Sequence, residues 1–268
     1  MPRMRLSTLT SCLLAGLMIG LTGCSSTAPD KTAGWSPNKI YAEAQDEMRS
    51  GAYDKAIPLL EKLEGRAAGT VLAQQAQLDK AYAQYKASEP AQATATIERF
   101  IKLHPASPAL DYALYLRGVV NFNDDLGLFS ALARQDLSER DQKAAKESYE
   151  AFKELVTRFP ESRYAADARQ RMTYIVNSLA MYEVHVARYY LSRGAYVAAI
   201  NRAQAATTDY ANVPAQEDAL NILVQAYDAL GMTQLRDDAR RVLEKSFPSS
   251  AHLPGNRAAQ SRPWWKFW

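Results

Sequence analysis

Apolar residues recur at helical spacing along almost the whole chain after residue 36, and proline or glycine interrupts them at intervals. Three interruptions share one pattern, in which an aromatic ring precedes a proline and a serine follows it by two positions. They lie at residues 103–107, 158–162 and 246–250. Proline ends a helix, and the serine can cap the next helix by accepting a hydrogen bond from a free backbone amide. Between these prolines, the segments 50–53 and 193–196 carry a Gly-Ala-Tyr motif that is typical of a tight turn within a helical hairpin.

Helix, glycine turn, helix and proline turn at a period of about 34 residues is the pattern of the tetratricopeptide repeat (TPR), and the chain resembles it from residue 37 to 248. Small residues should stand where paired helices approach most closely. They do so in four of five units: Ala44 with Ala56, Ala81 with Ala93, Gly118 with Ser148, and Ala187 with Ala199. The fifth unit has Val224 and Arg236 instead. We therefore expect an all-α, TPR-like solenoid of about five hairpins; a helical bundle with chance proline spacing is the alternative.

Two departures from the period predict local differences between the hairpins. The 42 residues from Gly118 to Pro160 exceed the consensus spacing of about 24, so the third hairpin should hold an insertion over 123–140. The 34 residues from Pro160 to Gly194 contain no further proline or glycine. They predict one continuous helix of about 30 residues, roughly 45 Å long, at the start of the fourth hairpin. This helix would separate three N-terminal repeats (37–160) from two C-terminal repeats (161–250).

The first residues have the pattern of a bacterial lipoprotein signal peptide. Arg3 and Arg5 precede an apolar run that ends in Leu-Thr-Gly-Cys at Cys24, and the run is too short for a membrane span. We expect residues 1–23 to be removed and Cys24 to be lipidated; an ordinary export signal with an incidental cysteine is the alternative. Residues 24–36 have a composition that cannot bury a core, so they should form a flexible tether. No aspartate follows Cys24, which resembles lipoproteins sorted to the outer membrane.

Charge and composition argue against nucleic acid binding and catalysis. Loss of Arg3 and Arg5 lowers the formal net charge from +3 to +1, so no field remains to attract nucleic acid. Cys12 would leave with the signal peptide, so no disulfide is expected. His104, His185 and His252 have no partner at metal-ligand spacing, and no glycine-rich phosphate loop or nucleophile constellation is present. We expect no cofactor, no metal and no enzymatic activity.

Taken together, the lipoprotein motif, the repeats, the insertion and the run from Tyr182 and Glu183 to Ala187–Ala195 resemble the BamD family of outer-membrane assembly lipoproteins. The resemblance implies a non-enzymatic subunit of the β-barrel assembly machinery. Such a subunit docks on the POTRA region of a BamA-like barrel subunit, associates with accessory lipoproteins and helps receive unfolded outer-membrane proteins. The alternative is another periplasmic TPR lipoprotein, such as a pilus pilotin or an envelope-division coordinator.

In TPR proteins the first helix of each hairpin lines the concave face. The corresponding positions of repeats one to three are rich in aromatic residues and predict a groove for an apolar peptide. The resemblance implies that the peptides are client tails that end in an aromatic residue. The candidate groove residues are Tyr41, Met48, Leu78, Tyr82, Tyr85, Tyr112, Tyr115 and Phe122. The same positions of repeat five are polar: Asp218, Asn221, Gln225 and Asp228. The alternative is that the aromatic residues are ordinary repeat core.

Two further surfaces are candidates for contacts. Arg188, Arg193 and Arg202, in repeats four and five, suit carboxylates on a partner domain, although exposed arginines on helices are often simply solvated. The tail over 251–268 carries three of the four tryptophans, Trp264, Trp265 and Trp268. This tail could be disordered, contact a membrane interface or a partner, or occupy the chain's own groove.

Overall fold

The structure, a computed structural model, describes residues 30–122, 142–254 and 256, and this part of the chain is helical with no strand. Its helices are α2 (Pro37–Arg49), α3 (Tyr53–Arg66), α4 (Val71–Lys86), α5 (Pro90–Leu103), α6 (Leu110–Phe122), α8 (Gln142–Arg158), α9 (Ala165–Ser192), α10 (Tyr196–Thr208), α11 (Ala215–Ala229) and α12 (Thr233–Ser246). The expected signal peptide, Cys24, the 123–140 insertion and the tail tryptophans lie outside the described residues.

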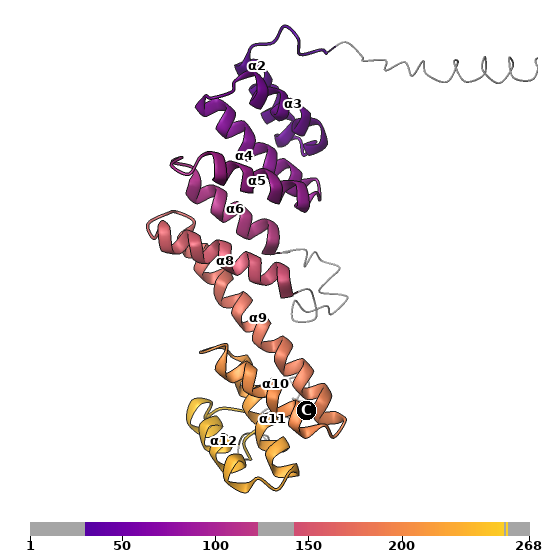
Figure 1. The fold of residues 1–268 in the computed structure, drawn as a ribbon, viewed down its shortest axis with the longest axis vertical. Coiled ribbons are helices and arrows are strands. Elements are labelled where there is room, and N and C mark those ends of the chain that lie inside the picture. Colours follow the sequence, from indigo (N-terminus) through magenta and orange to yellow (C-terminus); the bar gives the residue numbers. More distant parts are fainter. Residues whose placement is uncertain (1–29, 123–141, 255, 257–268) are drawn as a thin grey trace, which may run out of the picture.

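The helices pair in chain order into five hairpins, α2–α3, α4–α5, α6–α8, α9–α10 and α11–α12, and each hairpin packs on the next. The hairpins follow one another along the long axis of the molecule (Figure 1). The expected all-α, TPR-like solenoid is therefore confirmed. Across the described residues, no helix has the length and apolar character needed to span a bilayer.

Four hairpin turns share one backbone geometry. In each, the second residue after the first helix has positive φ: Gly51 (81°), Ser88 (64°), Gly194 (74°) and Gly231 (70°). The next amide then bonds back to a carbonyl five residues earlier, as in Ala52 N to Glu47 O at 2.9 Å. This arrangement satisfies carbonyls at the helix end, and glycine adopts it without strain. The Gly-Ala-Tyr motif marks only two of these turns; the other two use serine and a different glycine context.

The four pairs of small residues are buried where the helices of a hairpin meet. In the third pair, Ser148 Oγ donates a 2.8 Å hydrogen bond to the carbonyl of Gly118. A Cβ on Gly118 would lie 2.4 Å from the ring of Phe152, so only glycine fits there. In the fifth hairpin Arg236 forms ion pairs with Asp228 and Asp237 instead of closing a small contact.

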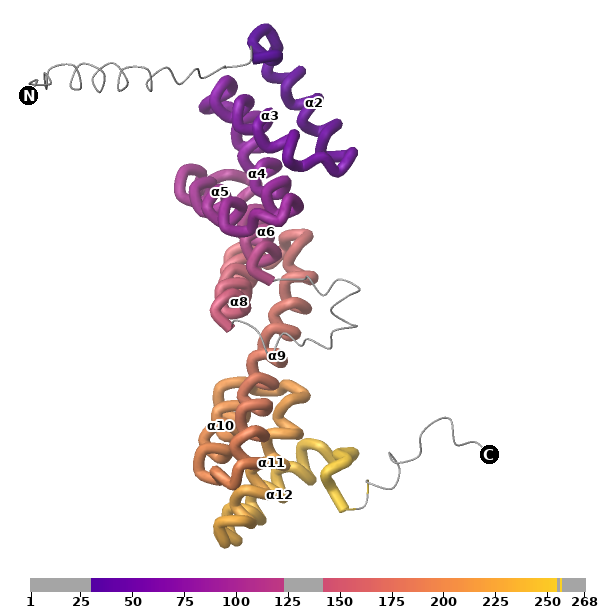
Figure 2. The backbone as a smooth tube through the Cα atoms, turned by 90° about the vertical axis from the view of Figure 1, so that its right-hand side faces the viewer, coloured from indigo at the N-terminus to yellow at the C-terminus, as the bar shows by residue number. Residues whose placement is uncertain are grey.

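Helix α9 has 28 residues and runs from beside α6 and α8 to beside α10 and α11, as Figure 2 shows. Its first half, including Ala168 and Ile175, belongs to the apolar core formed with α6 and α8. Its second half, including Val184 and Ala187, belongs to the core formed with α10, α11 and α12. The long continuous helix expected between Pro160 and Gly194 is therefore present, and it is shared by two cores.

Two of the linker serines accept hydrogen bonds from backbone amides at the starts of helices and make a second contact as well. Ser107 and Ser162 accept hydrogen bonds from the amides of Ala109 and Tyr164, which lie in the linkers before α6 and α9 begin. Their hydroxyls also donate across the repeat, Ser107 to Gln74 Oε1 at 3.0 Å and Ser162 to an aspartate of α6 at 2.7 Å. The serines therefore take up a free backbone amide ahead of the next helix, as expected, and they also fasten the linkers to the preceding hairpin.

The segment expected to be a tether is folded from residue 30 onward. Asp30 forms ion pairs with Lys62 and Arg66 of α3, and the Arg66 guanidinium donates to the carbonyl of Thr32 at 2.5 Å. Thr32 is buried, and Trp35 packs on the core of the first hairpin. Polar and turn-forming residues here bind the helix surface by hydrogen bonds and charge, which an argument from core composition does not detect.

Candidate functional site

The first helices of the first three hairpins, α2, α4 and α6, present a continuous wall of tyrosines. We call this wall the tyrosine face; it comprises Tyr41, Tyr82, Tyr85, Tyr112 and Tyr115, all half-buried. Tyr41, Tyr82, Tyr85 and Tyr115 pack on the cores of their own hairpins, and Tyr112 packs on the core shared by α4, α5 and α6. Half-buried tyrosines are rigid and amphipathic, so they offer contact area to a ligand at low entropic cost.

Three other candidate groove residues have mixed roles. Leu78 is 1% exposed and Phe122 is 7% exposed, so both are mainly core. Phe122 packs edge-on to Phe152 with ring centroids 6.3 Å apart. Met48 is half-buried beside the first core. The reading of these positions as ordinary repeat core therefore holds for Leu78 and Phe122, although each also lines a hollow at the surface.

A carboxylate lies in the middle of the tyrosine face. Asp79 Oδ2 accepts hydrogen bonds from Tyr41 Oη at 3.1 Å and from Gln45 Nε2 at 2.8 Å, both on α2. Its Oδ1 accepts from Gln75 Nε2 at 2.8 Å, one turn earlier on α4. Burial raises the pKa of Asp79, while these three bonds act in the opposite direction. Asp79 thus fastens the first hairpin to the second through side chains that line the same face.

Asp79 also influences the third hairpin. Burial raises the pKa of Tyr112, and the negative charge of Asp79 is the next largest cause. Burial likewise raises the pKa of Tyr41 to about 12, with Asp79 again contributing. The carboxylate is therefore electrostatically coupled to tyrosines on both neighbouring first helices.

The far end of the tyrosine face is held by a second network. Tyr115 stacks on Tyr164 with ring centroids 4.7 Å apart, and its hydroxyl donates to Asp167 Oδ2 at 2.8 Å. Arg171 Nε donates to the same carboxylate oxygen at 2.7 Å. Here the aspartate has a cationic partner, which distinguishes it from Asp79.

A surface hollow adjoins the tyrosine face at the start of α4. It is lined by that helix and by the linker between α5 and α6, and its wall includes Gln75, Leu78 and Ala109. Val71 and Leu103, which also line it, are 80% and 60% exposed. Exposed aliphatic side chains around a hollow can bury an apolar side chain of a ligand.

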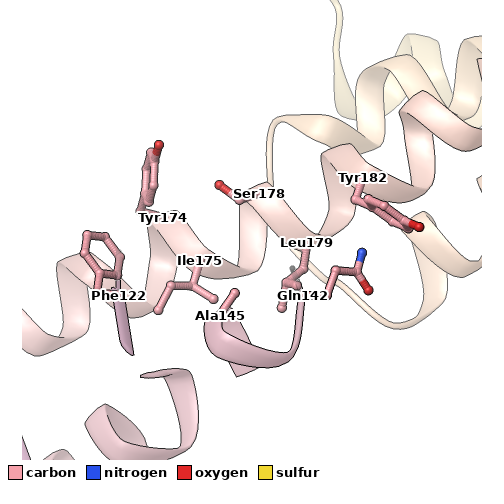
Figure 3. A pocket seen from close by; sticks show the side chains of 8 residues that line it. All are labelled: Phe122, Gln142, Ala145, Tyr174, Ile175, Ser178, Leu179 and Tyr182. Carbon is pink, nitrogen blue, oxygen red and sulfur yellow. The ribbon is translucent and has the colours of Figure 1, made fainter. Parts of the chain in front are cut away.

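A second apolar hollow lies between α8 and α9 (Figure 3). Most of its wall comes from α9, with Tyr174, Ile175 and Tyr182 among the lining residues, and Phe122 closes one end.

The three candidate docking arginines are exposed and lie near the turn between α9 and α10, but two of them already have acidic partners. Arg202 pairs with Glu183 at 3.1 Å, and Arg188 pairs with Asp218 at 3.2 Å. Arg193 lies over the ring of Tyr189 at 5.3 Å.

The C-terminal segment packs close to these arginines. His252 Nε2 lies 2.8 Å from Asp218 Oδ1, and Ser250 is buried. The candidate tail therefore begins with a folded stretch on α11. Trp264, Trp265 and Trp268 lie outside the described residues, as does Cys24.

Sequence reasoning missed Asp79 and Tyr164. Asp79 lies between an apolar residue and a lysine in α4, and its partners on α2 are 34 and 38 residues away. The available signal was its position one turn after Gln75 and three residues before Tyr82, on the face already assigned to binding. Tyr164 lies in a linker, where repeat positions give no information. Among the described residues, no cluster of histidine, cysteine, aspartate or glutamate could hold a metal ion.

Comparison with known proteins gives consistent matches over most of the chain. The family model described as "YfiO: Outer membrane lipoprotein" matches residues 34–243. The chain is 49% identical to the outer membrane protein assembly factor BamD of Neisseria meningitidis serogroup A, covering 96% of this chain and 98% of that one. It is 36% identical to the factor of the same name from Vibrio cholerae, covering 90% and 98%. Among solved structures, the crystal structure of MamA protein matches at 16% identity with a TM-score of 0.38, covering 85% and 96%.

Proposed function

Because the chain belongs to the YfiO family of outer membrane lipoproteins, which includes the BamD assembly factors, we propose that it acts in outer-membrane protein assembly as a non-enzymatic subunit of the BAM complex. The observation that carries this conclusion is 49% identity to an assembly factor over nearly the full length of both chains. The tyrosine face and the five-hairpin stack suit a protein that binds other polypeptides. Within that role we propose an outer-membrane location, with Cys24 as the lipid anchor and the repeats facing the periplasm.

The first test is the composition of the native complex. The tagged chain should be recovered from detergent-solubilised outer membranes together with a BamA-like barrel subunit and accessory lipoproteins. A Cys24→Ala variant should leave the membrane fraction while retaining its fold, because the lipid supplies the anchoring energy. Recovery of the wild-type chain without any barrel subunit would refute membership of this complex.

We assign client binding to the tyrosine face of the first three hairpins. Its rigid aromatic wall suits the amphipathic, aromatic-ended strands of unfolded outer-membrane proteins. The test compares Tyr82→Ala with Tyr85→Ala, as a double variant, against Tyr189→Ala, which removes an exposed tyrosine from α9. The double variant should weaken binding of a client C-terminal peptide by about tenfold or more, as expected for loss of anchor residues. Equal affinity of the wild-type and double variant, with helicity retained, would remove this assignment.

We assign docking on the POTRA region to α9, α10 and α11, with Arg188, Arg193 and Arg202 as contacts. A guanidinium that already pairs with a surface carboxylate can bind a second carboxylate from a partner. The single change Arg202→Glu would also break the internal ion pair, because the new glutamate would face Glu183 and repel it. The matched control is therefore the exchanged pair, Glu183→Arg with Arg202→Glu, which restores the internal ion pair.

Both variants should lose co-purification with the barrel subunit at moderate salt if Arg202 contacts the partner. Rescue by the exchanged pair would show instead that the internal ion pair matters. Normal recovery of both variants would exclude Arg202 from the docking surface.

A further inference from the structure

Asp79, on the tyrosine face, has hydrogen-bond donors but no cationic partner among the described residues. Asp79 accepts three hydrogen bonds, all from neutral side chains: Tyr41, Gln45 and Gln75. None of the causes that shift its pKa is a neighbouring lysine or arginine. Within the described part of the chain, no lysine or arginine lies within ion-pair distance of this carboxylate.

Three neutral donors compensate the charge of Asp79 only in part. Buried carboxylates are normally paired with a cation, because neutral hydrogen bonds replace only part of the lost hydration. Half-buried Asp111 likewise bonds to neutral groups, the Ser162 hydroxyl and the Tyr112 amide. The same protein shows the usual solution nearby, where Asp167 pairs with Arg171 at 2.7 Å. A carboxylate has about four acceptor positions, and the three neutral donors leave one of them, together with the full charge, for a ligand.

The residues around Asp79 indicate which kind of cation would bind it. Tyr82 lies one turn further along α4, and Tyr112 lies close enough on α6 for its pKa to respond to Asp79. Tyrosine rings beside a carboxylate favour a cation whose stem packs on the rings, and arginine does this best. The hollow lined by Val71 and Leu103 begins beside Gln75 and would receive a neighbouring apolar side chain.

We propose that Asp79 is the specificity residue of the tyrosine face, and that it binds an arginine or lysine flanked by apolar side chains within an extended client segment. This inference rests on the assignment of client binding to the tyrosine face. The basic residue lies inside the segment, away from its C-terminus, since Asp79 repels the terminal carboxylate, which would have to lie elsewhere on the face. The polar network holds Asp79 in place, and the cation completes the pair when the segment binds.

The test uses two peptides that differ only in one charge. Both are acetylated and amidated nonapeptides with alternating aromatic and aliphatic residues; one has a central arginine and the other has citrulline, which is neutral and of nearly the same shape. Binding to the full-length protein is measured by fluorescence anisotropy at low and moderate salt. Wild-type protein should bind the arginine peptide about tenfold more tightly or better, as for a charge-assisted hydrogen bond.

The variant is Asp79→Asn, which keeps an amide oxygen for Tyr41 but removes the charge. It should bind the two peptides equally, while its affinity for the citrulline peptide stays within about threefold of wild type. The control is Asp46→Asn on α2, which removes the same charge from an exposed position outside the face and should retain the preference. A purely structural role for Asp79 would lower both affinities together and leave their ratio unchanged.

The possible results distinguish failure of the role of Asp79 from failure of the client-binding assignment. Equal binding of the two peptides by wild-type protein would overturn the role of Asp79 without needing any variant. If Asp79→Asn keeps the preference, another residue reads the charge and the inference also fails. If neither peptide binds, and the Tyr82→Ala with Tyr85→Ala variant handles clients normally, the client-binding assignment itself fails.

Discussion

Gly118 gives the sharpest test of how the third hairpin is packed. The Gly118→Ala variant would place a Cβ 2.4, 2.6 and 2.7 Å from three ring carbons of Phe152. Ordinary carbon–carbon contacts are about 3.5–4.0 Å, so the ring would have to move by roughly 1 Å. Phe152 is 0% exposed and lies between Tyr115 and Phe122, with ring centroids 6.0 and 6.3 Å away. A displaced ring would therefore move against neighbouring side chains and not into solvent.

Two effects of opposite sign determine the size of the change. Alanine in a helix interior is favoured over glycine by about 1 kcal/mol. Overpacking a tight core costs about 1–3 kcal/mol and sometimes more, and this contact is well inside van der Waals distance. We expect the Gly118→Ala variant to lose about 2 kcal/mol in net free energy of unfolding, or about 4–8 °C in Tm for a chain of this length. The hydrogen bond from Ser148 to the Gly118 carbonyl would be displaced as well.

The assay is urea and thermal unfolding followed by circular dichroism, with Gly65→Ala as the matched control. Gly65 lies in α3, has no atom within 4 Å of an added Cβ, and should become neutral or up to about 1 kcal/mol more stable when replaced. Combining Gly118→Ala with Phe152→Leu should cost less than the sum of the two single changes, because the smaller side chain relieves the contact. If Gly118→Ala and Gly65→Ala change the free energy of unfolding equally, the close approach of α6 and α8 is wrong.

Three further predictions concern stability. Tyr115→Phe removes the hydrogen bond to the first turn of α9 and should cost about 1 kcal/mol in urea unfolding. Burial alone would raise the pKa of Glu154, but hydrogen bonds from Arg158 and Arg117 lower it overall. Its contribution is therefore present above the unfolded pKa of 4.5 and is lost as pH falls through the lower folded pKa; Glu154→Gln should flatten that part of a plot of stability against pH. Ser88→Gly should raise Tm by a few degrees, because serine holds a left-handed φ of 64° that glycine adopts freely; an unchanged Tm would contradict that strain.

Much of the fold was predictable because proline and glycine act on the backbone directly. Helices end two residues before Pro105, Pro160 and Pro248. The absence of proline and glycine between Pro160 and Gly194 implies a long helix. The small-residue pairs were predictable for a similar reason, since close helix contact excludes larger side chains. These features depend on local chemistry and on the repeat period alone.

The face to which we assign client binding was predictable only in outline. Repeat positions identified the tyrosines, but they did not separate Leu78 and Phe122, which are core, from side chains with an accessible edge. Asp79 gave only a weak local signal, its position on the same helix face as Gln75 and Tyr82, because its bonds to Tyr41 and Gln45 form only when the first two hairpins pack together. Long-range side-chain networks of this kind depend on how neighbouring repeats tilt, which one sequence does not specify.

Because α9 runs without a break through both of its apolar cores, its length determines the relative orientation of everything before and after it. Deleting one residue near Ser178 would turn the C-terminal hairpins by about 100° about the helix axis and draw them nearer by about 1.5 Å. Evolution can therefore lengthen or shorten the linkers of this molecule one residue at a time. Within α9, by contrast, the rotational phase is restored to within about 20° only by particular changes in length, such as about seven or eleven residues.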